Sequence, residues 1–253
     1  MVFRIGTAGW SIASHYADRF PRLGFALERY AGRFSCVEVN SSFYRSHRPT
    51  TWSRWGSIVP QGFRFAVKVP RTMTHERKLR DCSDLIARLL DETSGLGEKL
   101  AVLLVQLPPG LGYQAGVAED FFLELTAATP ARVVCEPRHP SWFEAAPDRL
   151  LARLGVARVA ADPARVPAAA VPGGWRGLSY WRLHGSPVVY RSPYGAEQLD
   201  DYAALLALES SAIEPPWCIF DNTASLAATG DALALCERLS LRGGRACIPS
   251  ASA

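Results

Sequence analysis

Long hydrophobic runs are missing from this sequence of 253 residues, although 48% of its residues are hydrophobic. Uninterrupted aliphatic runs such as Ala101 to Val105 are much too short to cross a membrane. The first residues, MVFRIG, enter a strand-like pattern directly, without the basic, apolar and cleavage regions of a secretory signal. We therefore expect neither a membrane segment nor a secretory signal.

Lysine is scarce and paired cysteines are absent. Only three of the 28 basic residues are lysines, and the charges that make up the net +4 are scattered along the chain. Charge alone therefore gives little reason to expect nucleic-acid binding. The six cysteines form no CxxC pair, which argues against a zinc ribbon and a disulfide framework and for a reducing cytoplasm. Cys36, Cys135 and Cys218 lie in apolar runs, where a free cysteine behaves as a small hydrophobic residue.

Repeats, low-complexity stretches and linkers are also missing, and the composition is that of a globular chain able to bury a full core. We expect one domain over residues 1–242, followed by a mobile tail over residues 243–253. A GxGxxG motif does not follow the first strand-like run, so no nucleotide cofactor is predicted.

Short apolar or β-branched runs recur about every 31 residues, the length of one strand–helix unit in a (β/α)8 barrel. The eight runs are Val2–Gly6, Cys36–Asn40, Arg64–Val69, Leu100–Leu107, Arg132–Glu136, Ala157–Asp162, Leu178–Gly185 and Cys218–Asn222. Helical periodicity fills most of the gaps, but residues 163–177 hold three prolines and three glycines and cannot form a crossover helix. The sequence predicts a closed α/β barrel, a (β/α)8 TIM-like fold, that is irregular between strands six and seven.

Polar side chains gather at the C-terminal ends of these runs, where TIM barrels place their active sites. They include Trp10, Glu38, Asn40, Lys68, Glu136, Arg138, Asp162, Arg182, His184, Asp221 and Asn222. Side chains two residues apart on a strand point the same way, so Arg182 and His184 should share one face, whereas adjacent Asp221 and Asn222 must diverge. The acids Glu38, Glu136 and Asp162 nearly balance the bases Lys68, Arg138 and Arg182, as an internal ion-pair network or a site for a small polar ligand requires.

The segments GTAGW, FSCVEVNSSFYR, FRFAVKVPRTMTH, LLVQLPP, EPRHPSW, WRLHG and FDNT, in this order, resemble the YecE-like family, a domain of unknown function with a TIM-barrel fold. The resemblance covers roughly residues 5–239. It implies the barrel and a pocket at the strand C-termini, and it implies no reaction. The family usually has a pair of asparagines where this chain has Asp221 and Asn222, and the acid could add metal-binding potential.

Several of these residues allow more than one interpretation. Lys68 could form a Schiff base, bind an anion, or pair with Glu38 or Glu136. His184 could be a general acid–base group, with Arg182 holding an anion, or a satisfied core histidine. The carboxylates with His184 could hold a divalent metal, although no local ligand spacing supports one. Trp10 could form an aromatic rim over a ligand or pack a loop.

Our leading hypothesis is an enzyme that uses acid–base chemistry on a small polar or anionic metabolite. The predicted catalytic residues are Glu38, Lys68, Glu136, Asp162 and His184, and the predicted substrate-binding residues are Trp10, Asn40, Arg138, Arg182 and Asn222. A metal-dependent hydrolase, acting on phosphodiesters or nucleic acid, is the first alternative. A non-catalytic ligand-binding or interaction barrel is the second. The sequence predicts neither the substrate nor the oligomeric state.

Overall fold

The computed structural model describes residues 1–209 and 213–246, and its strands form two hydrogen-bonded sheets. The smaller sheet is wholly parallel, in the order β1 (Arg4–Thr7), β10 (Trp217–Phe220), β9 (Tyr180–Leu183) and β7 (Ala160–Asp162). The larger sheet has the order β2 (Cys36–Val39), β3 (Arg64–Lys68), β4 (Leu100–Gln106), β5 (Arg132–Glu136), β6 (Val156–Arg158) and β8 (Gly173–Gly174). Only the short β8 is antiparallel to its neighbour. The parallel strands therefore carry their C-terminal ends to one edge.

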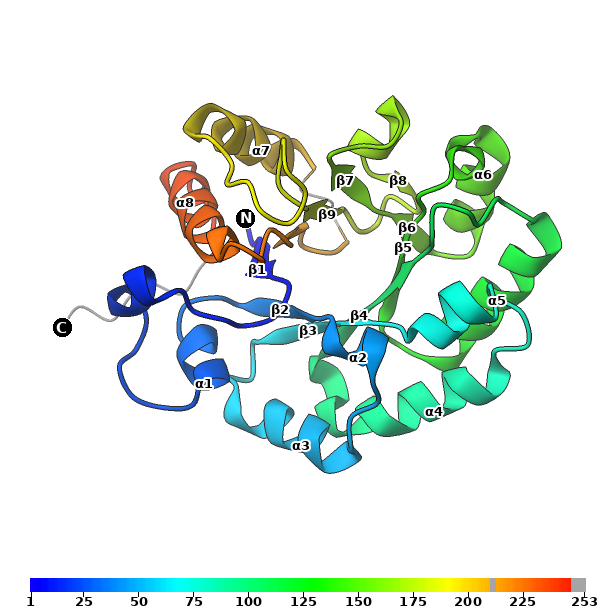
Figure 1. The fold of residues 1–253 in the computed structure, drawn as a ribbon, viewed down its shortest axis with the longest axis horizontal. Helices are drawn as coiled ribbons and strands as arrows, with labels where there is room; N and C mark the ends of the chain where they lie inside the picture. Colours follow the sequence, from blue (N-terminus) through cyan, green and yellow to red (C-terminus); the bar gives the residue numbers. More distant parts are fainter. Residues whose placement is uncertain (210–212, 247–253) are drawn as a thin grey trace.

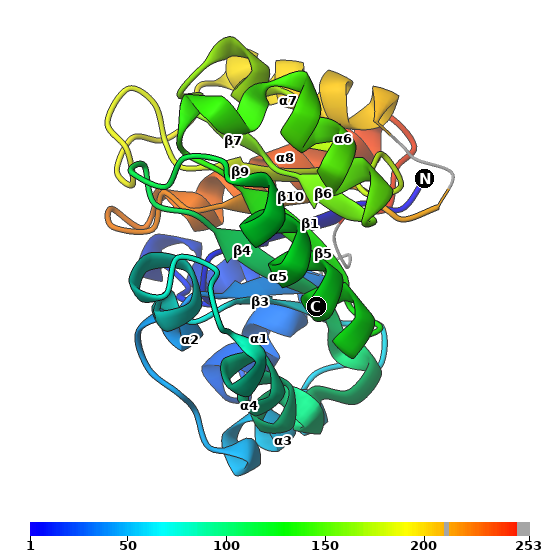
Figure 2. The same ribbon diagram turned by 90° about the vertical axis from the view of Figure 1, so that its right-hand side faces the viewer.

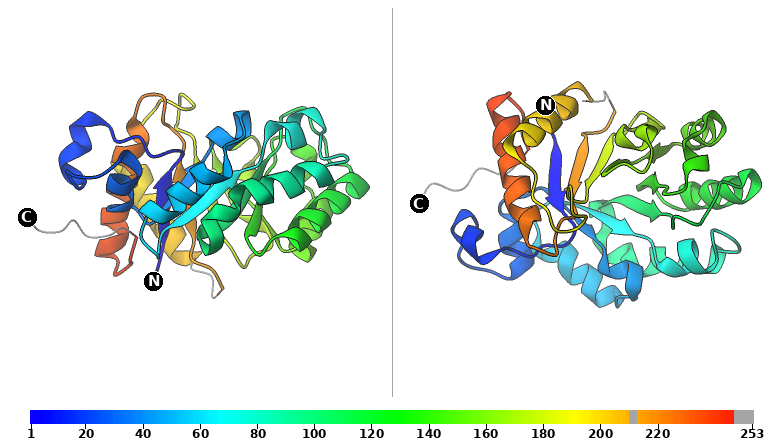
Figure 3. Two further views of the ribbon diagram at one scale, coloured as in Figure 1. Left: turned by 90° about the horizontal axis from the view of Figure 1, so that it is seen from below. Right: turned by 45° about the horizontal axis from the view of Figure 1, so that its top comes forward.

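Helices lie outside the strands (Figure 1, Figure 3). Parallel neighbours need crossover connections, and the apolar face of each crossover helix packs on the strands. In Figure 2, α6 and α7 lie towards the top, and α1, α3 and α4 lie below the sheets. The α-helices are α1 (Ala26–Ala31), α2 (Ser41–Tyr44), α3 (Pro49–Ile58), α4 (Ser83–Thr93), α5 (Ala115–Ala128), α6 (Ala145–Arg153), α7 (Ala196–Leu208) and α8 (Ala227–Leu241). Shorter helical turns are the 3-10 helices Ser14–Arg19, Ser94–Lys99, Pro140–Phe143 and Pro167–Ala170 and the π-helix Thr72–Glu76.

The sixth predicted strand is divided between the two sheets. Its first part, β6, pairs with β5, and the N–H of Val159 still bonds to the carbonyl of Cys135 at 2.8 Å. From Ala160 onwards the chain pairs with β9 instead. The segment up to β9 contains a 3-10 helix and β8 rather than an α-helix, so the predicted irregularity is confirmed.

The barrel is not closed, and the prediction of a closed barrel is wrong between β1 and β2. These strands share a single bridge, between Ala8 and Glu38, and no ladder. Elsewhere along this seam the buried hydroxyl of Tyr30 accepts the Thr7 N–H at 2.8 Å and donates to the Cys36 carbonyl at 3.1 Å. A tyrosine hydroxyl from α1 thus satisfies backbone groups that would otherwise bond across the seam.

We expect Tyr30→Phe to lower the free energy of unfolding by about 2–4 kcal/mol, because it leaves a buried N–H and a buried carbonyl without a partner. Urea denaturation measures the change. The matched control is Tyr44→Phe, which alters an exposed ring and should be neutral. Equal stability of the Tyr30 and Tyr44 variants would refute this account of the seam.

The C-terminal residues and the cysteines are placed as follows. Residues 243–246 are packed, since Arg245 pairs with Val2 and Ala246 is buried, while residues 247–253 lie outside the described part of the chain. Four cysteines are free and buried, namely Cys36, Cys82, Cys135 and Cys218. Cys236 is disulfide-bonded, against the expectation from cysteine spacing, and Cys247 lies outside the described residues. Among the described residues, no helix has both the length and the apolar character needed to cross a membrane.

Candidate functional site

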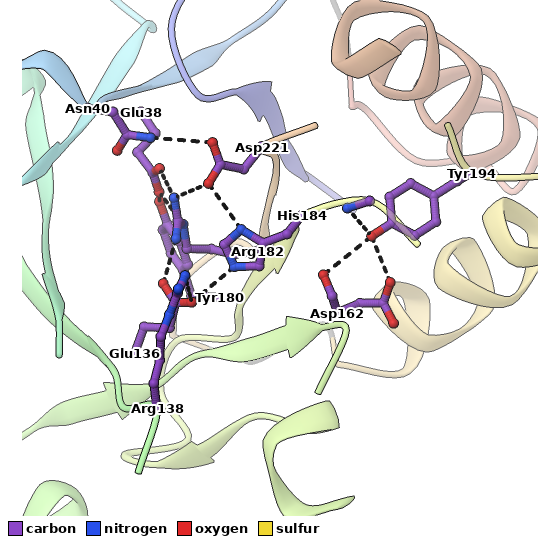
Figure 4. Close-up of polar contacts among 11 residues, drawn as sticks. Glu38, Asn40, Glu136, Arg138, Asp162, Tyr180, Arg182, His184, Tyr194 and Asp221 are labelled. Carbon is purple, nitrogen blue, oxygen red and sulfur yellow. Dashed lines mark hydrogen bonds and ion pairs between the residues drawn. The ribbon is translucent and has the colours of Figure 1, made fainter. Parts of the chain in front are cut away.

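Five ionisable side chains meet at the C-terminal ends of the strands, and we call them the strand-end cluster: Glu38, Glu136, Arg182, His184 and Asp221 (Figure 4). Glu38 is on β2 and Glu136 ends β5, whereas His184 and Asp221 directly follow β9 and β10. Arg182 and His184 project from one face, as the strand alternation predicted. All five are buried.

Arg182 is the centre of the cluster and is 0% exposed. Its Nε and Nη2 donate to the two oxygens of Glu38 at 3.1 and 2.7 Å. Its Nη1 donates to Oε2 of Glu136 at 2.5 Å, and Nη2 also donates to Oδ2 of Asp221 at 2.9 Å. Burial alone would lower the pKa of Arg182, but the facing carboxylates Glu136, Glu38 and Asp221 raise it well above its usual value. Arg182 thus holds three carboxylates in place through four donated hydrogen bonds.

His184 bridges two of those carboxylates. Its Nδ1 lies 3.0 Å from Oδ2 of Asp221, and its Nε2 lies 3.0 Å from Oε1 of Glu136. Ionised carboxylates only accept hydrogen bonds, so both ring nitrogens must carry a proton. Burial opposes the charge and would lower the pKa of His184, but Glu136 and Asp221 outweigh it and raise the pKa above its usual value. The two facing carboxylates and the raised pKa thus favour the imidazolium form of His184.

The two carboxylates that contact His184 are held ionised in turn. Burial alone would raise the pKa of Glu136, but Arg182, His184 and Arg138 bring it well below its usual value. The pKa of Asp221 is also lowered, because Arg182 and His184 outweigh its burial. Tyr180 completes the network by donating to Oε2 of Glu38 at 2.9 Å.

Two further cations lie beside the cluster. Arg138 donates from Nη2 to Oε1 of Glu136 at 3.3 Å. Lys68 is buried at the end of β3, and its Nζ lies 4.0 Å from the centre of the Phe43 ring. In the described residues Lys68 forms no ion pair, so the pairing with Glu38 or Glu136, one of the interpretations that the sequence allowed, is not observed. The four cations Arg138, Arg182, His184 and Lys68 thus face three carboxylates, which leaves one positive charge in excess.

A cavity of about 330 Å³ opens beside the cluster, and we call it the mouth cavity. Its wall includes Glu136, Arg138, Arg165 and His184. Arg165 is exposed and has no ion-pair partner among the described residues. A ligand entering this cavity would meet two guanidinium groups and the shared proton between His184 and Glu136. A larger cavity of about 680 Å³ lies at the N-terminal ends of β4 and β5, away from the cluster.

Tyr190 covers part of the site from the loop after β9. Its ring lies edge-on to the His184 ring at 5.7 Å. The backbone of Tyr190 has a φ of 67°, a left-handed conformation that costs energy outside glycine. Bonds from the Tyr190 N–H to the His184 carbonyl and from the Ala224 N–H to the Tyr190 carbonyl hold it.

The structure brings together most of the predicted site residues, but not Asp162, Asn222 or Trp10. Asp162 faces away from the cluster, where it accepts from the Tyr194 hydroxyl at 2.7 Å (Figure 4). Asn222 also points outward and donates to Ser192 and Asp231. Its neighbour Asp221 is the one that enters the cluster, as adjacent residues on a strand must diverge.

The remaining predicted residues are placed as follows. Trp10 packs edge-on against Trp55 at 4.9 Å, which fits the packing interpretation of this residue. Asn40 contacts the cluster through Asp221 at 3.5 Å. Sequence reasoning missed Tyr180, Tyr190 and Arg165. The spacing of Tyr180 two residues before Arg182 could have revealed it, but Tyr190 and Arg165 lie in loops without a periodic signal.

The cluster does not suit a metal ion. In the described part of the chain, no group of three or more His, Cys, Asp or Glu residues is arranged to hold one. The guanidinium of Arg182 lies where its three carboxylates converge, and both nitrogens of His184 donate to oxygen. A cation would have to displace these contacts.

We expect the stability that His184 contributes to depend on pH. Its folded-state pKa is raised, so its contribution is full below the unfolded value of 6.5 and is lost as the pH rises through the folded value. Wild type should exceed His184→Gln by about 1.5–3 kcal/mol near pH 6, where the hydrogen bonds are charge-assisted. The difference should shrink at higher pH. Urea denaturation of both proteins at pH 6 and pH 9 tests this, and a difference that grows with pH would contradict it.

Comparisons with known proteins bear on the family and the fold. A family model described as "Protein of unknown function DUF72" matches residues 4–252. The UPF0759 protein YecE of Escherichia coli K12 is 34% identical over 171 residues, a match that covers 65% of this chain and 61% of that protein. The alignment thus spans less than two thirds of the length of this relative.

Three similar structures show a TIM-barrel-like fold. A DUF72 family protein from Enterococcus faecalis V583 has a TM-score of 0.80 at 18% identity, with 100% of each chain covered. One from Thermotoga maritima has a TM-score of 0.77 at 20% identity and covers 95% of this chain and 100% of that chain. A xylose isomerase-like TIM barrel/4-hydroxyphenylpyruvate dioxygenase fusion protein has a TM-score of 0.53 at 14% identity, over 96% of this chain and 44% of that chain. At these identities the likeness concerns the fold alone.

Proposed function

The chain belongs to the DUF72 family, and from that premise and the geometry of the strand-end cluster we propose that it is an enzyme that performs acid–base chemistry on a small anionic metabolite. The single observation that carries the proposal is the His184–Glu136 pair. Nε2 of His184 lies 3.0 Å from Oε1 of Glu136, at the wall of the mouth cavity. A proton shared by two such groups can be given to a substrate or taken from it.

The charge of the site favours an anionic substrate. Burying an excess charge without a counter-ion is costly, and the cluster with Lys68 and Arg138 carries one positive charge more than its carboxylates neutralise. Arg138 and Arg165 both line the mouth cavity, and guanidinium groups bind carboxylate and phosphate with charge-assisted hydrogen bonds. A substrate with one carboxylate or phosphate group would supply the missing negative charge.

Catalysis is tested by measuring hydrogen exchange and turnover of candidate substrates. The protein would be incubated in D2O with a panel of small carboxylates, including pyruvate, and of phosphate monoesters, and followed by proton NMR. The proposal expects loss of C–H signals beside a carbonyl, or a new product, for at least one compound. If compounds bind but none exchanges or reacts, the protein is a non-catalytic ligand-binding barrel and the proposal is wrong.

We expect Arg138→Met to weaken binding of the panel's best ligand by about tenfold or more, because a charge-assisted hydrogen bond is worth about 1.5–3 kcal/mol. Titration calorimetry measures the change. Arg153→Met is the matched control, since Arg153 pairs with Glu119 on the surface. Equal affinities for the two variants would place the anion outside the mouth cavity.

The cytoplasm remains the predicted location. The four buried free thiols agree with a reducing compartment, whereas the disulfide at Cys236 is of a kind that oxidising compartments favour.

A further inference from the structure

We propose that Lys68 forms an imine with the carbonyl carbon of an aldehyde or ketone that also carries a carboxylate or phosphate group. The inference rests on the proposed function, because it names a substrate class for the strand-end cluster, whose charged groups Arg182, Glu136, Glu38 and Asp221 act on Lys68. Lys68 is a buried cation beside the cluster whose charged group is held by no carboxylate of the described chain, whereas the other unpaired cation, Arg165, is exposed.

The contacts of Lys68 are unlike those of two other cations, the half-buried Lys99 and the buried Arg158. Lys68 is 7% exposed, and its Nζ rests on the face of the Phe43 ring. By comparison, Lys99 donates to the carbonyls of Gly56 and Val59 at 2.7 and 2.8 Å, and Arg158 pairs with Asp148 at 3.0 Å. An amine fixed by backbone carbonyls or a carboxylate has its lone pair blocked by protonation, whereas the amine of Lys68 can lose a proton and attack.

The surroundings of Lys68 favour the neutral amine at mildly basic pH. Burial is the largest influence and lowers the pKa of Lys68, and the positive charge of Arg182 lowers it further. Glu136, Glu38 and Asp221 act in the opposite direction, with the net result that the pKa is about 8. A desolvated lysine beside another cation is the usual form of an imine-forming residue.

The step balances without a further reactant. The neutral Nζ attacks the carbonyl carbon, an N–C bond forms, and the π bond of the carbonyl breaks to leave a hydroxyl. That hydroxyl takes a proton and departs as water while the N–C bond becomes a protonated C=N bond. Starting from the ammonium, two of its protons leave in the water, so charge and protons balance. Loss of water needs an acid, and His184 is the acid that the proposed function supplies.

Reductive trapping tests the imine. Wild type is incubated with glyoxylate and cyanoborohydride near pH 8, and the modified lysines are found by mass spectrometry of peptides. Only Lys68, Lys78 and Lys99 are lysines, so the other two are internal controls. We expect Lys68 to be modified at least about tenfold faster than either, as an activated amine should be. The variant Lys68→Arg keeps the charge and should lose this fast modification.

The outcomes separate this inference from the proposed function. Glyoxylate binding by calorimetry without preferential modification of Lys68 would overturn the imine and leave an anion-binding lysine. Fast modification of Lys68 in a protein that catalyses no exchange with any panel compound would support the imine and overturn the enzyme proposal. Because the internal lysine controls are read in wild type, the test does not depend on folding of the variant.

Discussion

Replacing Arg182 with methionine is expected to lower the free energy of unfolding by about 3–5 kcal/mol, the usual effect of removing one partner from a buried ion pair. The guanidinium faces Glu38, Glu136 and Asp221, and it is completely buried. Its loss would leave three carboxylates within a few ångströms of one another. They would have to take up protons or admit water, and either change costs stability.

Urea denaturation at pH 7 measures this effect. The matched variant Arg153→Met removes a surface ion pair with Glu119, where a change within about 1 kcal/mol is expected. Loss of the guanidinium should raise the pKa values of the three carboxyl groups. At acid pH these groups take up protons, which relieves their repulsion, so the difference in stability between wild type and Arg182→Met should shrink. If Arg182→Met were as stable as Arg153→Met at pH 7, Arg182 would not be the centre that holds the cluster.

Replacing His184 with glutamine is expected to lower the exchange or turnover rate of the best panel compound by about 10²–10⁴-fold, the range that general acid–base catalysis contributes. Glutamine can donate a hydrogen bond to one carboxylate, but it cannot release a proton to a substrate. The NMR exchange assay measures the rate, and calorimetry measures whether the ligand still binds. The exposed His15→Gln is the matched control.

A His184→Gln protein that keeps both its ligand affinity and its rate would contradict the role of His184. A loss of affinity alone would make His184 a binding group. The proposal requires the loss to fall mainly on the rate, because Arg138 and Arg165 still line the mouth cavity.

Much of the cluster could be predicted from the sequence because strands alternate. The alternation placed Arg182 and His184 on one face, and it required Asp221 and Asn222 to separate. Which of the last two enters the cluster depends on the register of β10 against β9, in which Phe220 lies opposite Leu183. That register is set by packing along the whole strand, and no local sequence pattern predicts it.

The position of Asp162 and the open barrel both differ from the sequence-based expectation, and both differences come from long-range contacts. Asp162 ends an apolar run like the other acids, but its strand changes partner at Val159, so the alternation before that point does not carry over to Asp162. The closed barrel fails because one buried tyrosine, Tyr30, satisfies backbone groups along the β1–β2 seam. Both depend on contacts between residues far apart in the chain, which strand spacing does not encode.

The protonation state of His184 is the most direct test of the whole account. Side-chain ¹⁵N NMR, with His184 assigned by its absence from His184→Gln, reports whether one or both ring nitrogens carry a proton. The account predicts that both are protonated at pH 7, and that His184 titrates above His47 and His75, whose pKa values burial lowers. A neutral His184 ring at pH 7, with one bare nitrogen, would contradict it.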